Sequence, residues 1–125
     1  MKPLFALILI ALLAGTALAS PAPLACRLGA LNAREQGRHE TLQAELMKRA
    51  HVEERTDGYA LRFPGDAATY SKVVEFVGYE RRCCPFLNFE VRAGATNEPL
   101  WLVLTGTPEV KAFLSESDFF SAKTK

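Results

Sequence analysis

The residues best suited to chemistry gather in one short segment, Glu80-Arg81-Arg82-Cys83-Cys84-Pro85-Phe86. Two adjacent cysteines can form a strained vicinal disulfide, or both can bind one soft ion when they are reduced. The thiolate is the nucleophile and the metal ligand, so the thiol pKa decides reactivity. Arg81 and Arg82 favour the thiolate, whereas the negative end of a preceding helix dipole disfavours it. We expect the two cations to outweigh the dipole, provided that they point toward the sulfur atoms, with Glu80 as a further supporting residue.

Cys26 is the third of the three cysteines. It precedes the expected helical core, in a segment free to fold back over Cys83 and Cys84. Three sulfurs would form a trigonal donor set, which suits soft cations such as Cu(I) and Hg(II). A tetrahedral zinc site needs a fourth ligand, and His39 is the candidate because it lies on the apolar stripe of the first predicted helix. His39 equally fits a hydrogen-bonded histidine at the core edge, and we predict that His51 faces solvent.

Other interpretations of the cysteines stay open. Cys83 and Cys84 could be small buried hydrophobes that fill the helix–strand junction. An exported chain meets oxidising conditions, so Cys26 could form a structural disulfide with either of them. A thiol–disulfide enzyme is a further alternative, although the adjacent pair lacks the Cys-x-x-Cys spacing of thioredoxin-like proteins. Nothing in the sequence demands an enzyme, because it has no phosphate loop, dinucleotide fingerprint or nucleophile elbow.

Residues 1–19 have the pattern of a signal peptide. A positive start precedes an apolar run over residues 4–14, and the small residues Ala17 and Ala19 predict cleavage near Ala19. The run is too short to span a bilayer, which needs ~20 residues. We therefore expect a secreted or periplasmic protein. A lipid anchor at Cys26 is the weaker alternative, because the branched residue of the lipoprotein motif stands one place late.

Composition indicates a small globular domain. The chain has 125 residues, of which 49% are hydrophobic, and its net charge is +1. The high hydrophobic fraction argues against intrinsic disorder, and the near-zero net charge gives no excess of positive charge that would bind nucleic acid. We expect a segment over 20–31 that carries Cys26, one domain over 32–120 and a frayed tail over 121–125.

Hydrophobic periodicity predicts alternating helices and strands after residue 31. We expect a first helix over 32–55 with a capping box at its start, and a second over 66–82 that ends before Pro85. We expect strands over 59–63, 87–91 and 100–104, and a short last helix that begins at Pro108. The apolar stripe of the second helix is expected to comprise Tyr70, Val73, Val74 and Val77.

The predicted order is a helix followed by β-α-β-β-α. A right-handed crossover from the first to the second strand leaves room between them for the third, antiparallel to both. The strand over 100–104 is wholly apolar, which suits a central position. We therefore predict an α+β fold with a three-stranded antiparallel or mixed sheet in the order 1-3-2 and helices on one face. It is a ferredoxin-like arrangement that lacks its last strand.

Three segments resemble a family of small bacterial single-domain proteins. Residues 57–64, 80–90 and 99–106 carry this resemblance, with a Cys-Cys-Pro-Phe signature and a Trp-Leu-x-Leu-Thr-Gly strand. It extends back through Cys26 and His39 and covers most of the mature chain. Similar double-cysteine segments are associated with heavy-metal-responsive regulators and mercury-resistance contexts. The resemblance therefore implies soft-metal handling by the three cysteines, with His39 as a weaker addition. Many such domains look cytoplasmic, and this chain departs from them in its export signal.

Together these patterns predict a periplasmic thiolate protein that scavenges or carries Hg(II), Cu(I) or a similar ion, with zinc as a further candidate. Cys83 and Cys84 are the expected primary ligands and Cys26 the third. Expected partners are the thiophilic ion and either a membrane transporter or a redox partner, and not nucleic acid. The alternatives are a thiol–disulfide redox protein and a non-catalytic domain with a Cys26 disulfide that is structural or binds a partner.

Overall fold

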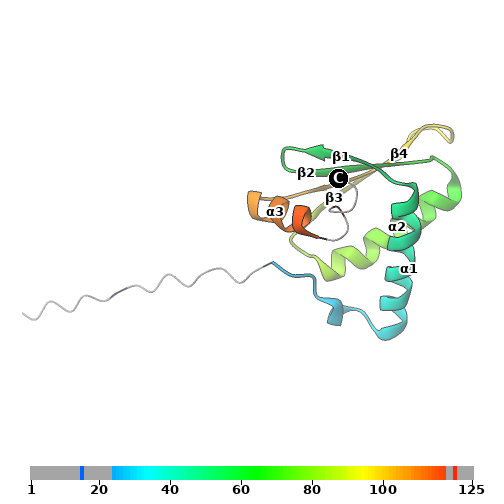
Figure 1. Ribbon diagram of the computed structural model, residues 1–125. Helices are drawn as coiled ribbons and strands as arrows, with labels where there is room; N and C mark the ends of the chain where they lie inside the picture. Colours follow the sequence, from blue (N-terminus) through cyan, green and yellow to red (C-terminus); the bar gives the residue numbers. More distant parts are fainter. Residues whose placement is uncertain (1–14, 16–23, 118–119, 121–125) are drawn as a thin grey trace, which may run out of the picture.

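A computed structural model describes Gly15, residues 24–117 and Phe120. The predicted signal peptide, apart from Gly15, and the predicted tail lie outside the described residues. The described chain forms one antiparallel sheet with helices packed against it (Figure 1). Its elements are η1 (Leu28–Ala30), α1 (Ala33–Arg49), β1 (His51–Arg55), β2 (Gly58–Phe63), α2 (Ala67–Cys83), β3 (Asn88–Arg92), β4 (Leu100–Thr105) and α3 (Pro108–Glu116).

Helix α1 begins where the sequence predicts and ends earlier. The Asn32 side chain accepts from the Glu35 N–H and the Glu35 carboxylate accepts from the Asn32 N–H, each at 2.9 Å, which confirms the capping box. The helix stops at Arg49, so the predicted extension to residue 55 is wrong. Residues 51–55 instead form strand β1 and pair with β2 across a tight turn. Most of β1 is exposed, so no apolar face held this segment in the helix.

The sheet has four strands in the order β1-β2-β4-β3, and every neighbouring pair is antiparallel. The predicted three-stranded sheet in the order 1-3-2 is therefore wrong, because it lacks the edge strand β1. The strand over 100–104 does pair antiparallel with both of its neighbours, as predicted. The error has one physical source, the Asp57-Gly58 turn. We interpreted it as the end of a helix, whereas it closes a hairpin whose backbone hydrogen bonds convert the preceding residues into an edge strand.

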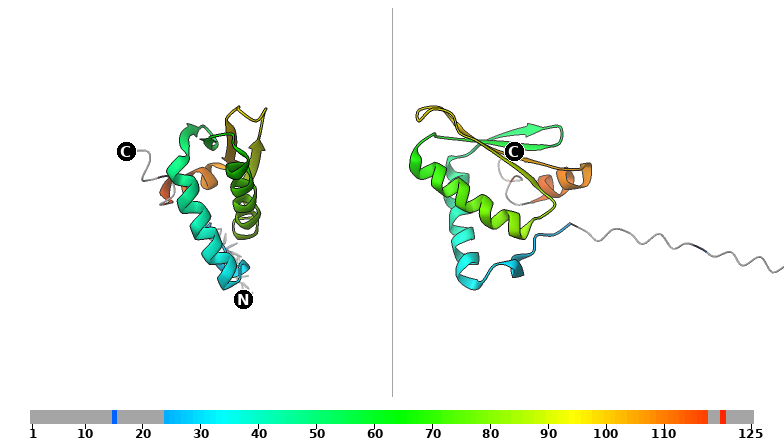
Figure 2. Two further views of the ribbon diagram at one scale, coloured as in Figure 1. Left: turned by 90° about the vertical axis from the view of Figure 1, so that its right-hand side faces the viewer. Right: turned by 180° about the vertical axis from the view of Figure 1, so that it is seen from behind.

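One face of the sheet makes the core. Leu61 pairs with Leu102 in the register of β2 and β4, and both side chains are completely buried. The helices lie on this face of the sheet (Figures 1 and 2). Residues of β4 that point the other way are also covered, since Val103 is buried and Trp101 is half-buried. Strand β4 is therefore internal to the sheet, as its continuous apolar run indicates.

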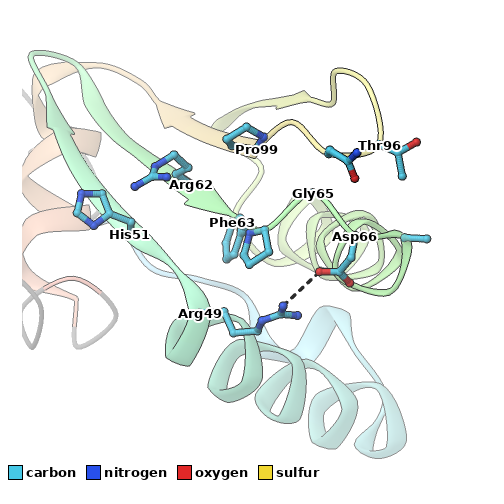
Figure 3. A pocket seen from close by; sticks show the side chains of 11 residues that line it. Arg49, His51, Arg62, Phe63, Gly65, Asp66, Thr96 and Pro99 are labelled. Atoms are coloured by element: carbon cyan, nitrogen blue, oxygen red, sulfur yellow. Dashed lines mark hydrogen bonds and ion pairs between the residues drawn. The ribbon is translucent and has the colours of Figure 1, made fainter.

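Helix α2 begins at the predicted cap, where the Asp66 carboxylate accepts from the Thr69 N–H at 2.9 Å. Arg49, at the end of α1, also pairs with Asp66 (Figure 3). The predicted apolar stripe is wrong at Tyr70 and Val74, which are about half exposed, whereas Val73 is completely buried as predicted. Thr69 can occupy the buried face because its hydroxyl donates to Asp66, a partner that hydrophobic patterning does not reveal. The buried residues of α2 are Thr69, Val73, Phe76 and Cys83.

Ion pairs and one lysine hold the helices in place. Arg38 of α1 makes a bidentate contact with Glu75 of α2, with N–O distances of 2.9 and 2.8 Å. Lys111 of α3 donates to the Gly58 carbonyl at 3.0 Å and lies 4.2 Å from the centre of the Tyr59 ring. Within the described part of the chain, no helix is both long and apolar enough to cross a bilayer.

Candidate functional site

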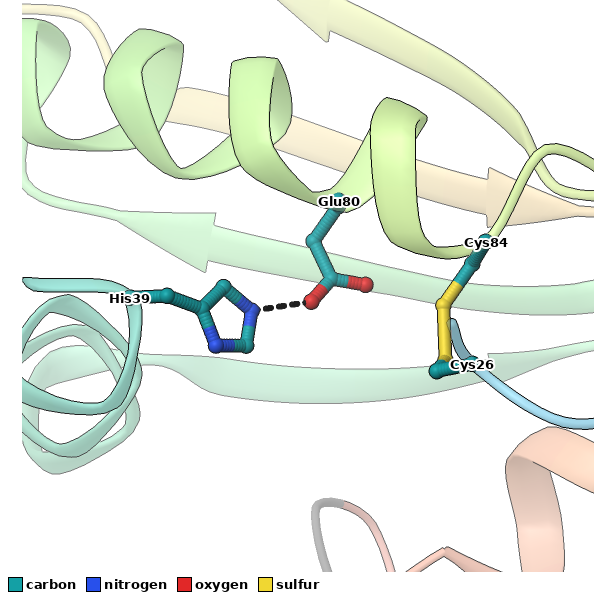
Figure 4. Close-up of a disulfide and its surroundings, with 4 residues drawn as sticks. All are labelled: Cys26, His39, Glu80 and Cys84. Carbon is teal, nitrogen blue, oxygen red and sulfur yellow. Dashed lines mark hydrogen bonds and ion pairs between the residues drawn. A yellow bond between two sulfur atoms is a disulfide. The ribbon is translucent and has the colours of Figure 1, made fainter. Parts of the chain in front are cut away.

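A disulfide joins Cys26 to Cys84 at the C-terminal end of α2 (Figure 4). The two Cα atoms lie 4.8 Å apart and the bond spans 58 residues of sequence. Cys26 is exposed, whereas Cys84 is completely buried at the C-cap of α2. Either Cys83 or Cys84 was a possible partner on the sequence alone, and the structure gives Cys84.

The segment before α1 is held against α2 by its backbone. The Arg27 N–H donates to the Cys83 carbonyl at 2.7 Å, which sets Cys26 beside the helix end. Arg82 donates to the Ala30 carbonyl at 2.7 Å and to the Glu35 carboxylate at 2.9 Å. The guanidinium of Arg82 therefore ties down the segment instead of pointing at the cysteines.

Cys83 carries a free thiol that faces the core. Burial raises the pKa of this thiol, the Glu80 carboxylate raises it further, and the Arg82 guanidinium opposes the rise. The expectation that two arginines would favour a thiolate here is wrong, because desolvation penalises the charged form more than the cation stabilises it. Arg81 is exposed.

His39 and Glu80 form a buried polar pair beside the disulfide. His39 Nε2 contacts a carboxylate oxygen of Glu80, and the side chains are only 8% and 15% exposed. The imidazole stacks on Phe76 with 5.3 Å between ring centroids, and it packs edge-to-face on Tyr79 at 6.4 Å. His39 is therefore the hydrogen-bonded histidine that its place on the apolar stripe allows, and its ring is fixed by aromatic contacts.

Glu80 links this pair to the sulfurs (Figure 4). The two sulfur atoms of Cys26 and Cys84 and a carboxylate oxygen of Glu80 all lie within 4.8 Å of one another. Cys83 and His39 do not belong to this group of donor atoms among the described residues. The structure thus places a carboxylate between a disulfide and a histidine. Cys83 is not one of these donors, although it lines the same cavity and its thiol is buried.

The disulfide and the His39–Glu80 pair line a cavity of about 260 Å³. The cavity reaches the surface at Cys26 and Leu28, since both residues are exposed. Its apolar lining consists of Phe76, Leu87, Leu104, Phe113, Leu114 and Phe120. The local hydrophobic periodicity of the strands and helices does not reveal this cavity, because its walls come from five separate parts of the chain.

A second, more open pocket of about 590 Å³ lies near the start of α2. His51 and Arg62 face each other across β1 and β2 at its rim (Figure 3). His51 is exposed, as the sequence predicts. Arg49 in this pocket is already paired with Asp66. None of the three cysteines lines this pocket.

One sequence signal could have assembled much of this site. Phe76, Glu80 and Cys84 are spaced four residues apart, which places them on one face of a helix. His39 lies on the stripe of α1 with Leu42 and Leu46, and all three are buried. Two facing helices would therefore present the histidine and the carboxylate to each other.

Comparisons with protein-family models, with curated proteins and with solved structures find no match.

Proposed function

We propose that this protein is a thiol–disulfide redox protein in which Cys26 and Cys84 are the reacting pair. The observation that carries the proposal is the cluster of both sulfurs and the Glu80 carboxylate within 4.8 Å, at the edge of a cavity. A disulfide that serves only as a crosslink needs neither a buried histidine–carboxylate pair beside it nor a cavity at its sulfurs. Redox exchange uses both.

The different burial of the two cysteines assigns their roles. Cys26 is exposed, so an incoming thiolate attacks its sulfur, and the Cys26–Cys84 bond breaks. Cys84 leaves as a thiolate into a buried site, where it takes up a proton. The product is a mixed disulfide at Cys26. A second thiol then attacks the incoming group, which releases that group as a disulfide and leaves Cys26 and Cys84 reduced.

Glu80 and His39 handle the proton of this step. The contact between His39 Nε2 and the Glu80 carboxylate lies next to the sulfur that leaves, so a proton carried by this pair can pass to that sulfur. Transfer to the Cys84 thiolate neutralises a charge that burial would otherwise disfavour. In the reverse direction the same carboxylate removes the Cys84 proton and prepares the thiolate for attack. Phe76 and Tyr79 keep the imidazole in place for both directions.

Export supports this role. The pattern of residues 1–19 predicts export to an oxidising compartment, where dithiol pairs exchange with partner thiols. We place the protein in the periplasm or outside the cell on that basis. A lipid anchor would need the sulfur of Cys26 that the disulfide uses, so the two states exclude each other.

A trapping experiment tests the assignment. Reduced protein is mixed with 2-hydroxyethyl disulfide and analysed by peptide mass mapping. The Cys84→Ser variant should accumulate the adduct on Cys26, whereas the wild type should expel it and recover the Cys26–Cys84 disulfide. The Cys83→Ser variant is the matched control and should behave as wild type. An adduct that forms on Cys83, or a wild-type disulfide that exchanges only after denaturation, would contradict the redox function.

Soft-metal binding is the second candidate function, and the same donor cluster favours it. Once reduced, Cys26 and Cys84 offer two thiolates beside the Glu80 carboxylate. Thiolates select thiophilic ions such as Cu(I) and Hg(II) over harder cations. This set replaces the predicted trio, since Cys83 lies outside the group and His39 is bound to Glu80. The oxidised protein cannot supply these thiolates, so binding depends on prior reduction.

Competition with a chromophoric chelator tests this candidate on the reduced protein with Cu(I). Cys84→Ser should remove binding, whereas Cys83→Ser should leave the affinity unchanged. An equal loss of Cu(I) affinity in both variants would indicate instead that Cys83 and Cys84 are both ligands. Stoichiometric binding to the oxidised protein would show that another site holds the ion.

A further inference from the structure

We infer that the cavity beside the Cys26–Cys84 disulfide binds the apolar body of a small neutral thiol that reduces this disulfide. The inference rests on the proposed redox function and names its substrate class. Three features of the cavity carry it, namely its size, its lining and its charge.

The size of the cavity suits a small molecule. Its volume of about 260 Å³ exceeds the roughly 150 Å³ apolar cavity that is known to bind benzene. It lies below the range of about 300–1,000 Å³ that is typical of pockets for drug-sized ligands. One aromatic ring with a short chain therefore fits, whereas a peptide does not enter. The occupant is a thiol because one wall of the cavity is the disulfide itself.

The lining favours an apolar and uncharged body. Phe113 and Leu114 of α3, together with Phe76 and Leu104, form the apolar part of the lining. Among the described residues that line it there is no lysine or arginine, and the one carboxylate, Glu80, is already in contact with His39. The other polar lining residues, Gln43, Ser117 and the free cysteine Cys83, have uncharged side chains. A thiol that carries carboxylates, such as glutathione, finds no cation there to replace its lost hydration. A neutral apolar thiol has no such cost.

The step balances with thiols alone. A bound thiol loses its proton, and its sulfur attacks Cys26 while the bond to Cys84 breaks. Cys84 takes up a proton. A second thiol loses its proton and attacks the sulfur of the first, which forms a free disulfide and releases Cys26 as a thiolate that is then protonated. Two thiols are oxidised to one disulfide, and two electrons reduce the protein disulfide to two thiols.

Reduction rates of the oxidised protein test the inference. Benzyl mercaptan, 2-mercaptoethanol and glutathione are compared, and each rate is divided by the rate of the same thiol with 2-hydroxyethyl disulfide, which removes differences in intrinsic reactivity. The normalised rate with benzyl mercaptan should exceed the other two by at least about tenfold and should saturate, since burial of a ring supplies binding free energy. Benzyl methyl sulfide, which cannot exchange, should inhibit competitively.

A charge placed at the mouth of the cavity gives an independent test. Leu28 lines the mouth and is 54% exposed, so its substitution spares the core. Leu28→Arg should raise the normalised rate of glutathione several-fold relative to that of 2-mercaptoethanol. Val74→Arg is the matched control, because Val74 is 45% exposed and lies outside the lining. It should change none of the rates.

The possible outcomes distinguish a failure of this inference from a failure of the proposed redox function. Equal normalised rates for all three thiols, with a disulfide that still exchanges, would overturn the substrate class alone. A disulfide that resists every thiol in the native protein would overturn both. Inhibition by benzyl methyl sulfide that is not competitive would place the apolar site elsewhere and overturn the inference.

Discussion

Glu80 joins the two halves of the site, because its carboxylate contacts His39 and lies within 4.8 Å of both sulfurs. Glu80→Gln keeps the shape of the side chain and removes its proton transfer. We expect the disulfide still to form, but more slowly, and the rate of its reduction by dithiothreitol to fall by about 10²-fold, the lower limit for a general acid–base group. Stopped-flow thiol detection at pH 7 measures the rate.

Glu75→Gln is the control for this substitution. Glu75 lies on the same helix and pairs with Arg38 away from the disulfide. It should leave the reduction rate within about twofold of wild type, since surface ion pairs contribute little. Equal losses in both variants would mean that helix stability, and not proton transfer, limits exchange.

Cys83 predicts a pH dependence of stability. Its folded pKa is raised above the usual value of 9.0, so the folded state keeps its proton where the unfolded state loses it. The stabilisation is therefore complete below pH 9 and declines as the pH rises from 9 through the folded pKa. Urea unfolding between pH 8 and 10.5 measures the slope. Cys83→Ala should show a shallower decline, and parallel slopes would contradict the burial of an uncharged thiol.

The sequence revealed the reactive residue types and left their pairing open. Helical spacing alone indicates that Cys83 and Cys84 point about 100° apart, so both cannot face Cys26. Which of them does depends on the rotation of α2 about its axis. The buried face that fixes this rotation includes Thr69, a polar residue bonded to Asp66, which a hydrophobic pattern does not predict.

At the level of elements, the approach of β2 to β4 depends on a glycine. A Cβ added to Gly58 would clash with the Leu104 carbonyl, whereas nothing lies within 4 Å of one added to Gly37 in α1. We expect Gly58→Ala to lower the free energy of unfolding by about 1–3 kcal/mol, the usual cost of overpacking. Gly37→Ala should instead raise it by about 0.5–1 kcal/mol. Urea denaturation of both variants compares them, and equal signs would contradict the strand register.

The elements with local signals were predictable. Capping at Asn32 and Asp66, the break after Cys84 and alternation in β2 all act within a few residues of sequence. Strand β1 could not be predicted in this way, because its residues have no clear alternation and become a strand only through pairing with β2. The tertiary contact outweighs the local preference for helix.

For the whole molecule, the effect of disulfide reduction on the free energy of unfolding distinguishes a structural disulfide from one that exchanges with thiols. A crosslink across 58 residues that only restrains the unfolded chain would stabilise the fold by about 4 kcal/mol. By the same thermodynamic cycle, folding would stabilise that disulfide against reduction. We therefore expect reduction to lower the free energy of unfolding by less than about 2 kcal/mol. Urea unfolding of oxidised and reduced protein at pH 7 measures the difference, and a loss near 4 kcal/mol would indicate a structural crosslink.

The reduction potential of the Cys26–Cys84 pair tests the redox function most directly. The Cys83→Ser variant, which isolates this pair, is equilibrated in dithiothreitol buffers and in glutathione buffers, and its thiols are counted by alkylation and mass. We predict a reversible two-electron transition between about −270 and −120 mV, the range of thiol–disulfide exchange proteins. A potential below about −300 mV, typical of structural disulfides, would contradict the proposed function.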